Sequence, residues 1–357
     1  MIAWYVGIWI TKAERFAIFT PDPFCWYEGV DVMIRQIFIG GTGRSGTTIL
    51  SKILGKHSEI FRYPFETRFI IDPDGLIDLI PALSDQWSPW KGDSAVRRFE
   101  KLMWEIYPPR IRGNLRRFLS QAIGRVGISP PRYALWKSYK DIIPREEYLK
   151  ALNDFINKLY YKKFSGYWVG TPAYWIRPKI IATKRFEKSE ILALASTFVN
   201  KISLYPMKKE NKKIWLDHTP FNILHAHFLY ELFPEMKLIH IYRDPRDVIS
   251  SYKTKKWGGN SAMDNILLIK YIFNKWDEEK TKIPEDKYYE VKLEDLVRRP
   301  EKELKNIVDF LGIKYEKNLL SVDLSKSHSG RWKKDLSKEE VEVIEKHLKD
   351  ILNKYNY

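Results

Sequence analysis

The chain has 357 residues, of which 44% are hydrophobic, so it can bury a sizeable core and is not a disordered protein. Lys and Arg number 61 against 45 Asp and Glu, and the formal charge of +16 suits an anionic partner (nucleotide, nucleic acid, acidic glycan or membrane surface) or a Lys-rich solvated surface. The single cysteine, Cys25, excludes an intramolecular disulfide and a cysteine-cluster metal site, which suits a reducing compartment.

The first ten residues are apolar and aromatic, but Lys12 follows closely, so this run is too short to span a membrane. No small-residue cleavage site of a secretory signal stands out after it. Met33 opens the first clear strand. We therefore expect an N-terminal extension over residues 1–32, with Met33 as an alternative start, a domain over 33–357, and a cytoplasmic location.

Short apolar strands alternate with helices along most of the chain. A buried strand at 37–39 leads through a glycine-rich turn into a helix over 47–54. Further strands are expected at 213–217, 237–242 and 288–292, and further helices at 221–233, 245–257, 301–311 and 338–352. This order predicts a three-layer, P-loop-type α/β domain around a central parallel sheet, with a helical insertion at about 90–205.

The turn from Gly40 to Thr48 has the features of a phosphate-binding loop, because it is rich in glycine and lies between a strand and a helix. The Walker A pattern of ATPases and kinases would place a lysine at position 47, where this chain has Thr47. Arg44 lies inside the loop instead. These two differences argue against an ordinary kinase or ATPase. The alternative to a phosphate-binding loop is a turn with a purely structural role.

A second motif runs from Leu238 to Ser251. Asp244 is placed to cap a helix whose first residue is Pro245. The preceding strand therefore ends in Arg243, a cation, where an NTPase more often has a metal-binding acid, and Ser251 follows about two helical turns later. The alternative is that Arg243 is merely a helix-flanking partner of an ion pair.

Together the two motifs resemble those of sulfotransferases that use 3′-phosphoadenosine 5′-phosphosulfate, and the loop with His57 and Glu66-Thr67-Arg68 is similar to the tyrosylprotein sulfotransferases. The resemblance implies that this nucleotide is the sulfuryl donor. Its 5′-phosphosulfate would lie on the loop residues Gly43, Arg44, Ser45, Gly46, Thr47 and Thr48, and its 3′-phosphate on Arg243, Ser251 and Lys255.

The C-terminal third resembles the same family at 291–296 and 310–312, although Leu293 stands where a tyrosine is usual. Residues 326–333 resemble the loop that closes over the 3′-phosphate. Its usual arginine is replaced by Ser325, which leaves Lys326 as the candidate ligand, with a basic surface loop as the alternative.

The resemblance further implies an in-line transfer of the sulfuryl group to a hydroxyl or amine, with Glu66 as the base and Arg44 stabilising the transferring group. His218 replaces the family's usual lysine. It could stabilise the leaving oxygen if protonated, be the base if neutral, or be structural. We expect neither a catalytic metal nor a nucleic-acid partner. The alternatives are a divergent P-loop kinase or NTPase and a non-catalytic nucleotide or polyanion binder.

Overall fold

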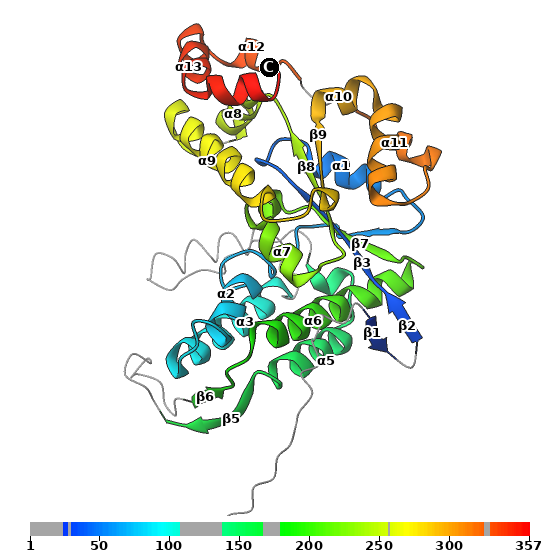
Figure 1. Cartoon of the computed structure of the whole chain (residues 1–357), viewed down its shortest axis with the longest axis vertical. Coiled ribbons are helices and arrows are strands. Elements are labelled where there is room, and N and C mark those ends of the chain that lie inside the picture. Colours follow the sequence, from blue (N-terminus) through cyan, green and yellow to red (C-terminus); the bar gives the residue numbers. More distant parts are fainter. Residues whose placement is uncertain (1–23, 28–29, 108–137, 167–178, 256–257, 325–328) are drawn as a thin grey trace, which may run out of the picture.

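In the computed structural model, five parallel strands form a central sheet in the order β4-β7-β3-β8-β9 (Figure 1). The structure describes residues 24–27, 30–107, 138–166, 179–255, 258–324 and 329–357, with side chains from residue 34 onwards. The strands are β3 (Arg35–Gly40), β4 (Ile60–Arg62), β7 (Ile214–Asp217), β8 (Lys237–Tyr242) and β9 (Tyr288–Lys292). Four of the five were predicted, and the short edge strand β4 was not.

Both faces of this sheet are buried, because successive side chains of each strand enter opposite apolar clusters. Ile37 and Ile39 pack on one side, and Phe38 between them packs on the other. The first side is covered by α1 (Thr47–Leu54), α10 (Leu293–Arg298) and α11 (Pro300–Leu311), and the second by α6 (Lys188–Lys209), α7 (Ala226–Leu232) and α9 (Ala262–Lys280). The predicted three-layer α/β fold is therefore confirmed.

A third apolar cluster joins α8 (Pro245–Lys255), α9 and α13 (Lys338–Lys354) near the C-terminus (Figure 1). Two of these helices begin with capping boxes, in which Ser261 and Asp264 start α9 and Ser337 and Glu340 start α13. The short elements of this half are η3 (Glu285–Lys287), η4 (Lys317–Ser321) and α12 (Trp332–Asp335).

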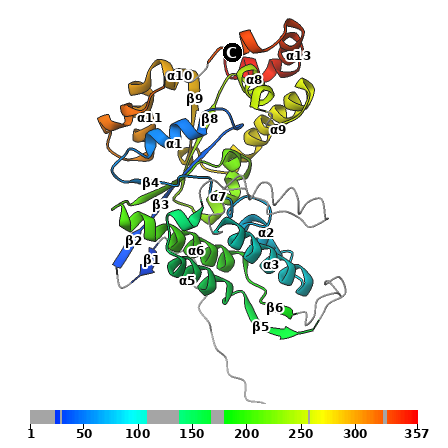
Figure 2. The ribbon, with the colours of Figure 1, turned by 180° about the vertical axis from the view of Figure 1, so that it is seen from behind.

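The middle of the chain is mainly helical, as expected, and gathers at the end of the molecule away from α13 (Figure 2). Its helices are α2 (Leu76–Leu83), α3 (Pro89–Ile106), η1 (Tyr139–Asp141), α5 (Arg145–Ile156) and α6. They share one apolar cluster with Phe38 and Trp215 of the sheet. The antiparallel strands β5 (Tyr160–Ser165) and β6 (Lys179–Thr183) were not anticipated, and the limits of the insertion stay a prediction.

Two local predictions differ from the structure. Met33 does not open the first strand, because it ends β2 (Val30–Met33), which pairs with β1 (Phe24–Tyr27) in an antiparallel hairpin. The helix expected over 221–233 is instead a 3₁₀ turn, η2 (Pro220–His225), followed by α7. The Asn222 side chain bonds the carbonyl of Ile39 at 3.1 Å, which holds this turn against the sheet.

The aromatic contact between Phe38 and Trp215 provides a test of the core. Both side chains are fully buried, and their rings meet edge to face with centroids 5.3 Å apart. We expect Phe38→Ala to lower the free energy of unfolding by about 3–5 kcal/mol, because it leaves a cavity between sheet and helices. Leu267→Ala, on the exposed side of α9, should change it by less than about 0.5 kcal/mol in the same urea titration.

Candidate functional site

The candidate residues lie beyond the carboxyl ends of parallel strands, where ligands of such sheets bind. The glycine-rich loop follows β3, Glu66 lies a few residues after β4, His218 follows β7, and Arg243 follows β8. The register of the sheet sets Phe38 beside Asp217 and Gly40 beside His240, so these ends lie next to one another. The parallel pairing thus brings together segments that are far apart in the sequence.

The loop is held in a conformation that depends on glycine. Gly46 has φ +108°, and a Cβ there would lie 2.9 Å from Leu293 Cδ1, so a side chain would be both strained and crowded. Gly46 caps α1 without a side-chain hydrogen bond, and the first turn of α1 has no acidic residue. The first amides of α1 and the positive end of its dipole are therefore available to an anion.

Arg44 is also in the left-handed region, with φ +58°, a conformation that costs a non-glycine residue about 1–2 kcal/mol. Two contacts hold it there. Arg243 Nη1 donates to the Arg44 carbonyl at 3.3 Å, and Arg44 Nε donates to Ser251 Oγ at 3.1 Å. The loop is therefore tied to β8 and α8, and the Arg44 side chain is turned toward Ser251.

The carboxylate of Asp247 is the junction between Arg243 and the C-terminal segment. It is buried, forms an ion pair with Arg243 at 3.3 Å, and accepts hydrogen bonds from Gly330 N at 2.7 Å and Trp332 N at 2.9 Å. Asp244 accepts from Arg246 N at 2.9 Å, which confirms the predicted helix cap. Asp247 thus fixes the backbone on both sides of Arg331.

These contacts surround a cavity of about 360 Å³, a size typical of small-molecule sites. It contains seven of the candidate residues, namely Arg44, Gly46, Thr47, Thr48, Arg243, Ser251 and Lys255. The cavity therefore joins the glycine-rich loop to the second motif, and four of its described lining side chains are cationic: Arg44, Arg243, Lys255 and Arg331.

Three lining residues were missed by sequence reasoning: Ile49, Leu293 and Arg331. Arg331 was passed over because Lys326 was chosen by its position in the motif, and Lys326 lies outside the described residues. The signal that could have found Arg331 is that it is the one arginine of the segment 326–333. It directly precedes α12, and the Arg246 guanidinium of α8 lies 4.3 Å from the ring centroid of the adjacent Trp332. The described lining does not include Gly43, Ser45, Glu66 or His218.

Glu66 lies in a partly closed setting between charges of both signs. Its carboxylate forms an ion pair with Arg68, and about a quarter of its side chain is exposed. Burial raises the pKa of Glu66 to about 7, with Arg68 opposing the shift and the charges of Asp217 and Asp72 adding to it. A carboxyl group that titrates near neutral pH is suited to accept a proton.

His218 is buried, and its Nδ1 has no hydrogen-bond partner within the described part of the chain. Burial lowers the pKa of His218 to about 4; the charge of Asp217 opposes this, and those of Arg62, Arg68 and Lys52 add to it. The imidazole is therefore neutral at pH 7 in the protein without ligand, which favours the base or structural alternative over stabilisation of a leaving oxygen, and the role of His218 stays a prediction.

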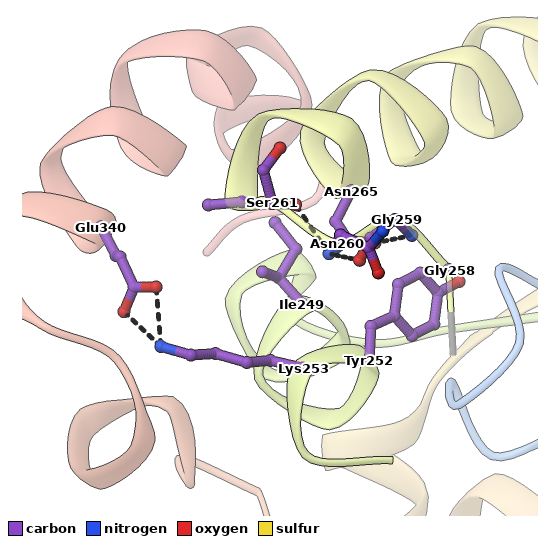
Figure 3. Close-up of a pocket in the computed structure, with 10 residues that line it drawn as sticks. Ile249, Tyr252, Lys253, Gly258, Gly259, Asn260, Ser261, Asn265 and Glu340 are labelled. Atoms are coloured by element: carbon purple, nitrogen blue, oxygen red, sulfur yellow. Dashed lines mark hydrogen bonds and ion pairs between the residues drawn. The ribbon is translucent and has the colours of Figure 1, made fainter. Parts of the chain in front are cut away.

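Figure 3 shows a second cavity, of about 330 Å³, between α8, the start of α9 and α13. Its polar groups bond one another: Lys253 pairs with Glu340 at 2.7 Å, and Asn265 accepts from Gly259 N at 2.8 Å. This cavity thus differs from the first one, because Lys253 is the one cationic side chain in its described lining, whereas the first has four.

Replacing Asp247 by Asn should loosen the segment that carries Arg331. One of the two carboxylate oxygens becomes an NH₂ donor, so either Gly330 or Trp332 loses its acceptor, at a cost of about 1–3 kcal/mol. We expect at least one of these amides to exchange with solvent tenfold faster or more in hydrogen-exchange experiments. Exchange of the Ile241 amide in β8 should not change, and in the control variant Lys253→Gln the amides of Gly330, Trp332 and Ile241 should all exchange as in wild type. Unchanged exchange of Gly330 and Trp332 in Asp247→Asn would contradict the role of Asp247 as the junction.

Within the described residues, no helix is long and apolar enough to span a bilayer. The same residues hold no group of three or more His, Cys, Asp or Glu side chains arranged to bind a metal ion.

Comparison with known proteins places the chain. A model of the sulfotransferase family matches residues 36–103 and 115–317. Omega-hydroxy-beta-dihydromenaquinone-9 sulfotransferase Stf3 of Mycobacterium bovis is 26% identical over 145 residues, which span 36% of this chain and 37% of that protein.

Among solved structures, the sulfotransferase domain of the Synechococcus PCC 7002 olefin synthase is 19% identical with a TM-score of 0.39, covering 87% of this chain and 82% of that one. The sulfotransferase domain of the curacin biosynthetic pathway is 16% identical with a TM-score of 0.43, covering 88% and 96%.

The family model covers well over half of the chain, and it includes both the glycine-rich loop and the Arg243–Ser251 motif. The chain belongs to the sulfotransferase family.

Proposed function

We propose that this protein transfers a sulfuryl group from 3′-phosphoadenosine 5′-phosphosulfate to a hydroxyl or amine acceptor. The observation that carries the proposal is the single cavity in which the loop residues Gly46 to Thr48 face Arg243, Ser251 and Lys255. A donor with phosphates at both ends of its ribose needs two anion sites a short distance apart. A nucleoside triphosphate, whose phosphates form one chain, does not.

The donor would bind with its 5′-phosphosulfate on the loop amides and the start of α1, where helix dipole and backbone donors favour an anion. Its 3′-phosphate would lie among Arg243, Ser251 and Lys255, and we add Arg331 to the same phosphate, while Lys326 stays a prediction from the sequence. Ile49 and Leu293 are the apolar residues of the described lining, and we assign them to the adenine.

In the reaction, the acceptor oxygen or nitrogen attacks the sulfur atom and the bond from sulfur to the 5′-phosphate oxygen breaks. The products are the sulfated acceptor and 3′,5′-adenosine bisphosphate. The acceptor's proton passes to the carboxylate of Glu66, whose pKa of about 7 supports this role over His218, whose pKa is about 4. Positioning and cationic stabilisation supply the rest of the rate enhancement, as in phosphoryl transfer.

Two roles in donor binding and transfer are considered for Arg44. The sequence predicts that it stabilises charge on the transferring group, and that role stays a prediction. Its guanidinium bonds Ser251 at the 3′ end of the cavity, which supports an additional contact with the 3′-phosphate. Independence from metal ions and a cytoplasmic location are likewise part of the proposal.

The acceptor class is the open part of this proposal. The curated relative is named for an omega-hydroxy menaquinone, so a lipid hydroxyl is the first acceptor to test, although the match spans only 37% of that protein. A practical panel contains 1-dodecanol, 4-methylphenol, N-acetylglucosamine and a tyrosine peptide, with release of 3′,5′-adenosine bisphosphate from the donor as the signal.

Binding of the bisphosphate tests the donor assignment. Arg331→Ala should weaken binding of 3′,5′-adenosine bisphosphate by about 10–100-fold, because it removes a charged hydrogen bond worth about 1.5–3 kcal/mol. Binding of 5′-AMP, which lacks the 3′-phosphate, should stay unchanged in the same calorimetric titration. Lys334→Ala removes the same charge from an exposed position and serves as the control.

The rival enzyme class gives the opposite result in that titration. Binding of ATP that requires Mg²⁺, without binding of the bisphosphate, would replace the sulfotransferase proposal by a P-loop kinase or NTPase. A polyanion binder without catalysis would instead bind heparin or nucleic acid with a steep salt dependence and tolerate the loss of Glu66.

The role of Glu66 predicts a pH dependence. The base must be ionised, so kcat should rise with pH and level off above about 7, where Glu66 loses its proton. Glu66→Gln should lower kcat by about 10²–10⁴-fold and remove this acidic limb, with bisphosphate affinity nearly unchanged. An unaltered kcat in Glu66→Gln would assign the proton transfer to another group.

A further inference from the structure

The carboxylate of Asp217, at the end of β7, is fully buried and accepts four hydrogen bonds. Oδ1 accepts from Thr67 N at 3.0 Å and from Thr219 Oγ1 at 3.1 Å. Oδ2 accepts from Asn222 Nδ2 at 2.8 Å and from Thr219 N at 3.2 Å. These four donors are amides and a hydroxyl, so they solvate the negative charge without neutralising it.

The donors come from two parts of the chain: Thr67 lies in the segment after β4, and Thr219 and Asn222 lie in the segment after β7. Thr67 follows the proposed base, and its carbonyl is held from the other side by the Tyr139 hydroxyl at 3.0 Å. Asn222 also bonds the carbonyl of Ile39, one residue before the end of β3. Two residues earlier, the carbonyl of Pro220 accepts from Gly41 N, the first amide of the loop, at 2.7 Å.

One side chain therefore connects the segment of Glu66 to the start of the phosphate loop. Each link is a hydrogen bond of ordinary length between buried groups, so the distance from Glu66 to the loop is set with little freedom. Burying an un-neutralised carboxylate is a costly way to obtain this link, because amide or apolar groups can join two segments at a lower desolvation cost. The charge itself is therefore expected to have a use.

We propose that Asp217 is a positioning residue for sulfuryl transfer, which holds the Glu66–Thr67 segment at a fixed place beside the donor loop and acts on the reaction through Glu66. This inference rests on the proposed function, because it assigns the base role to Glu66. It adds to that function a residue that touches neither the donor nor the acceptor.

The charge of Asp217 also acts on Glu66 directly. It raises the pKa of Glu66, as does the charge of Asp72, whereas Arg68 lowers it. Removing the charge of Asp217 should therefore lower the pKa of Glu66 and move the acidic limb of the kcat profile to lower pH. The other titratable groups in this neighbourhood are His218, Arg62, Lys52, Tyr63 and Tyr139.

The test is a double-mutant cycle between Asp217→Asn and Glu66→Gln, assayed with the panel acceptor that wild type uses best. Asp217→Asn alone should lower kcat by about 10–100-fold, the scale expected when a catalytic group is displaced by about 1 Å. It should also shift the acidic limb downward and leave the Kd of 3′,5′-adenosine bisphosphate within about threefold. In the Glu66→Gln background the same change should have almost no further effect on kcat.

Asp72→Asn is the matched control. It removes a second carboxylate that raises the pKa of Glu66 but bonds Arg68, at 3.3 Å, rather than Thr67. It should shift the acidic limb in the same direction and leave the plateau of kcat within about threefold. A limb that moves in Asp72→Asn but not in Asp217→Asn would contradict the charge effect assigned to Asp217.

Additive losses in the cycle, or a fall in bisphosphate affinity that parallels the fall in kcat, would overturn the proposal and make Asp217 a structural or donor-binding residue. If Asp217→Asn does not fold, Thr219→Val takes its place, since it removes one donor from the oxygen that bonds Thr67. It should lower kcat a few-fold, and Glu66→Gln should absorb this loss too. Wild type that neither binds the bisphosphate nor consumes the donor would refute the proposed function instead.

Discussion

Because helices cover both faces of the parallel sheet, a ligand can reach its strands only at their ends, and the loop after β3 and the segments of Glu66, His218 and Arg243 all lie beyond the carboxyl ends. The pairing of β3 with β7 and β8 fixes how far apart those segments are. The loop after β3, the histidine after β7 and the arginine after β8 are consequently neighbours before any side chain is considered. Neighbouring strands lie about 4.8 Å apart, and this spacing sets the distances between the segments that form the site.

Two buried aspartates convert this arrangement into a defined geometry. Asp217 joins the ends of β4, β7 and β3, and Asp247 joins Arg243 to the segment around Arg331. Neither lies in the described lining of the cavity: Asp217 bonds the amide that follows Glu66, and Asp247 is paired with Arg243.

The sequence was informative where a function depends on local order. Two features belong to contiguous segments: the strand, glycine turn and helix around Gly46, and the eight-residue spacing from Arg243 to Ser251. The structure brings both segments to one cavity. Four strands of the sheet were recognised for the same reason, since each is a short contiguous run rich in apolar or aromatic residues. β4 was missed because only three residues, Ile60–Arg62, form it.

What the sequence did not reveal depends on contacts between distant residues. Arg331 reaches the cavity because Asp247, more than eighty positions earlier, binds the amides on either side of it. The neutrality of His218 follows from burial beneath other segments, and the pKa of Glu66 follows from charges brought near it by the fold. No spacing rule within one motif contains this information.

The cationic lining of the main cavity has a consequence for turnover. Under the proposed function its charged and hydroxyl groups hold two phosphates, and both phosphates remain on the nucleotide after the sulfuryl group has left. For a transferase of the proposed kind, the spent nucleotide is therefore held nearly as firmly as the fresh one. We therefore expect its release to limit turnover, and we expect free bisphosphate to inhibit the enzyme by competing with the donor.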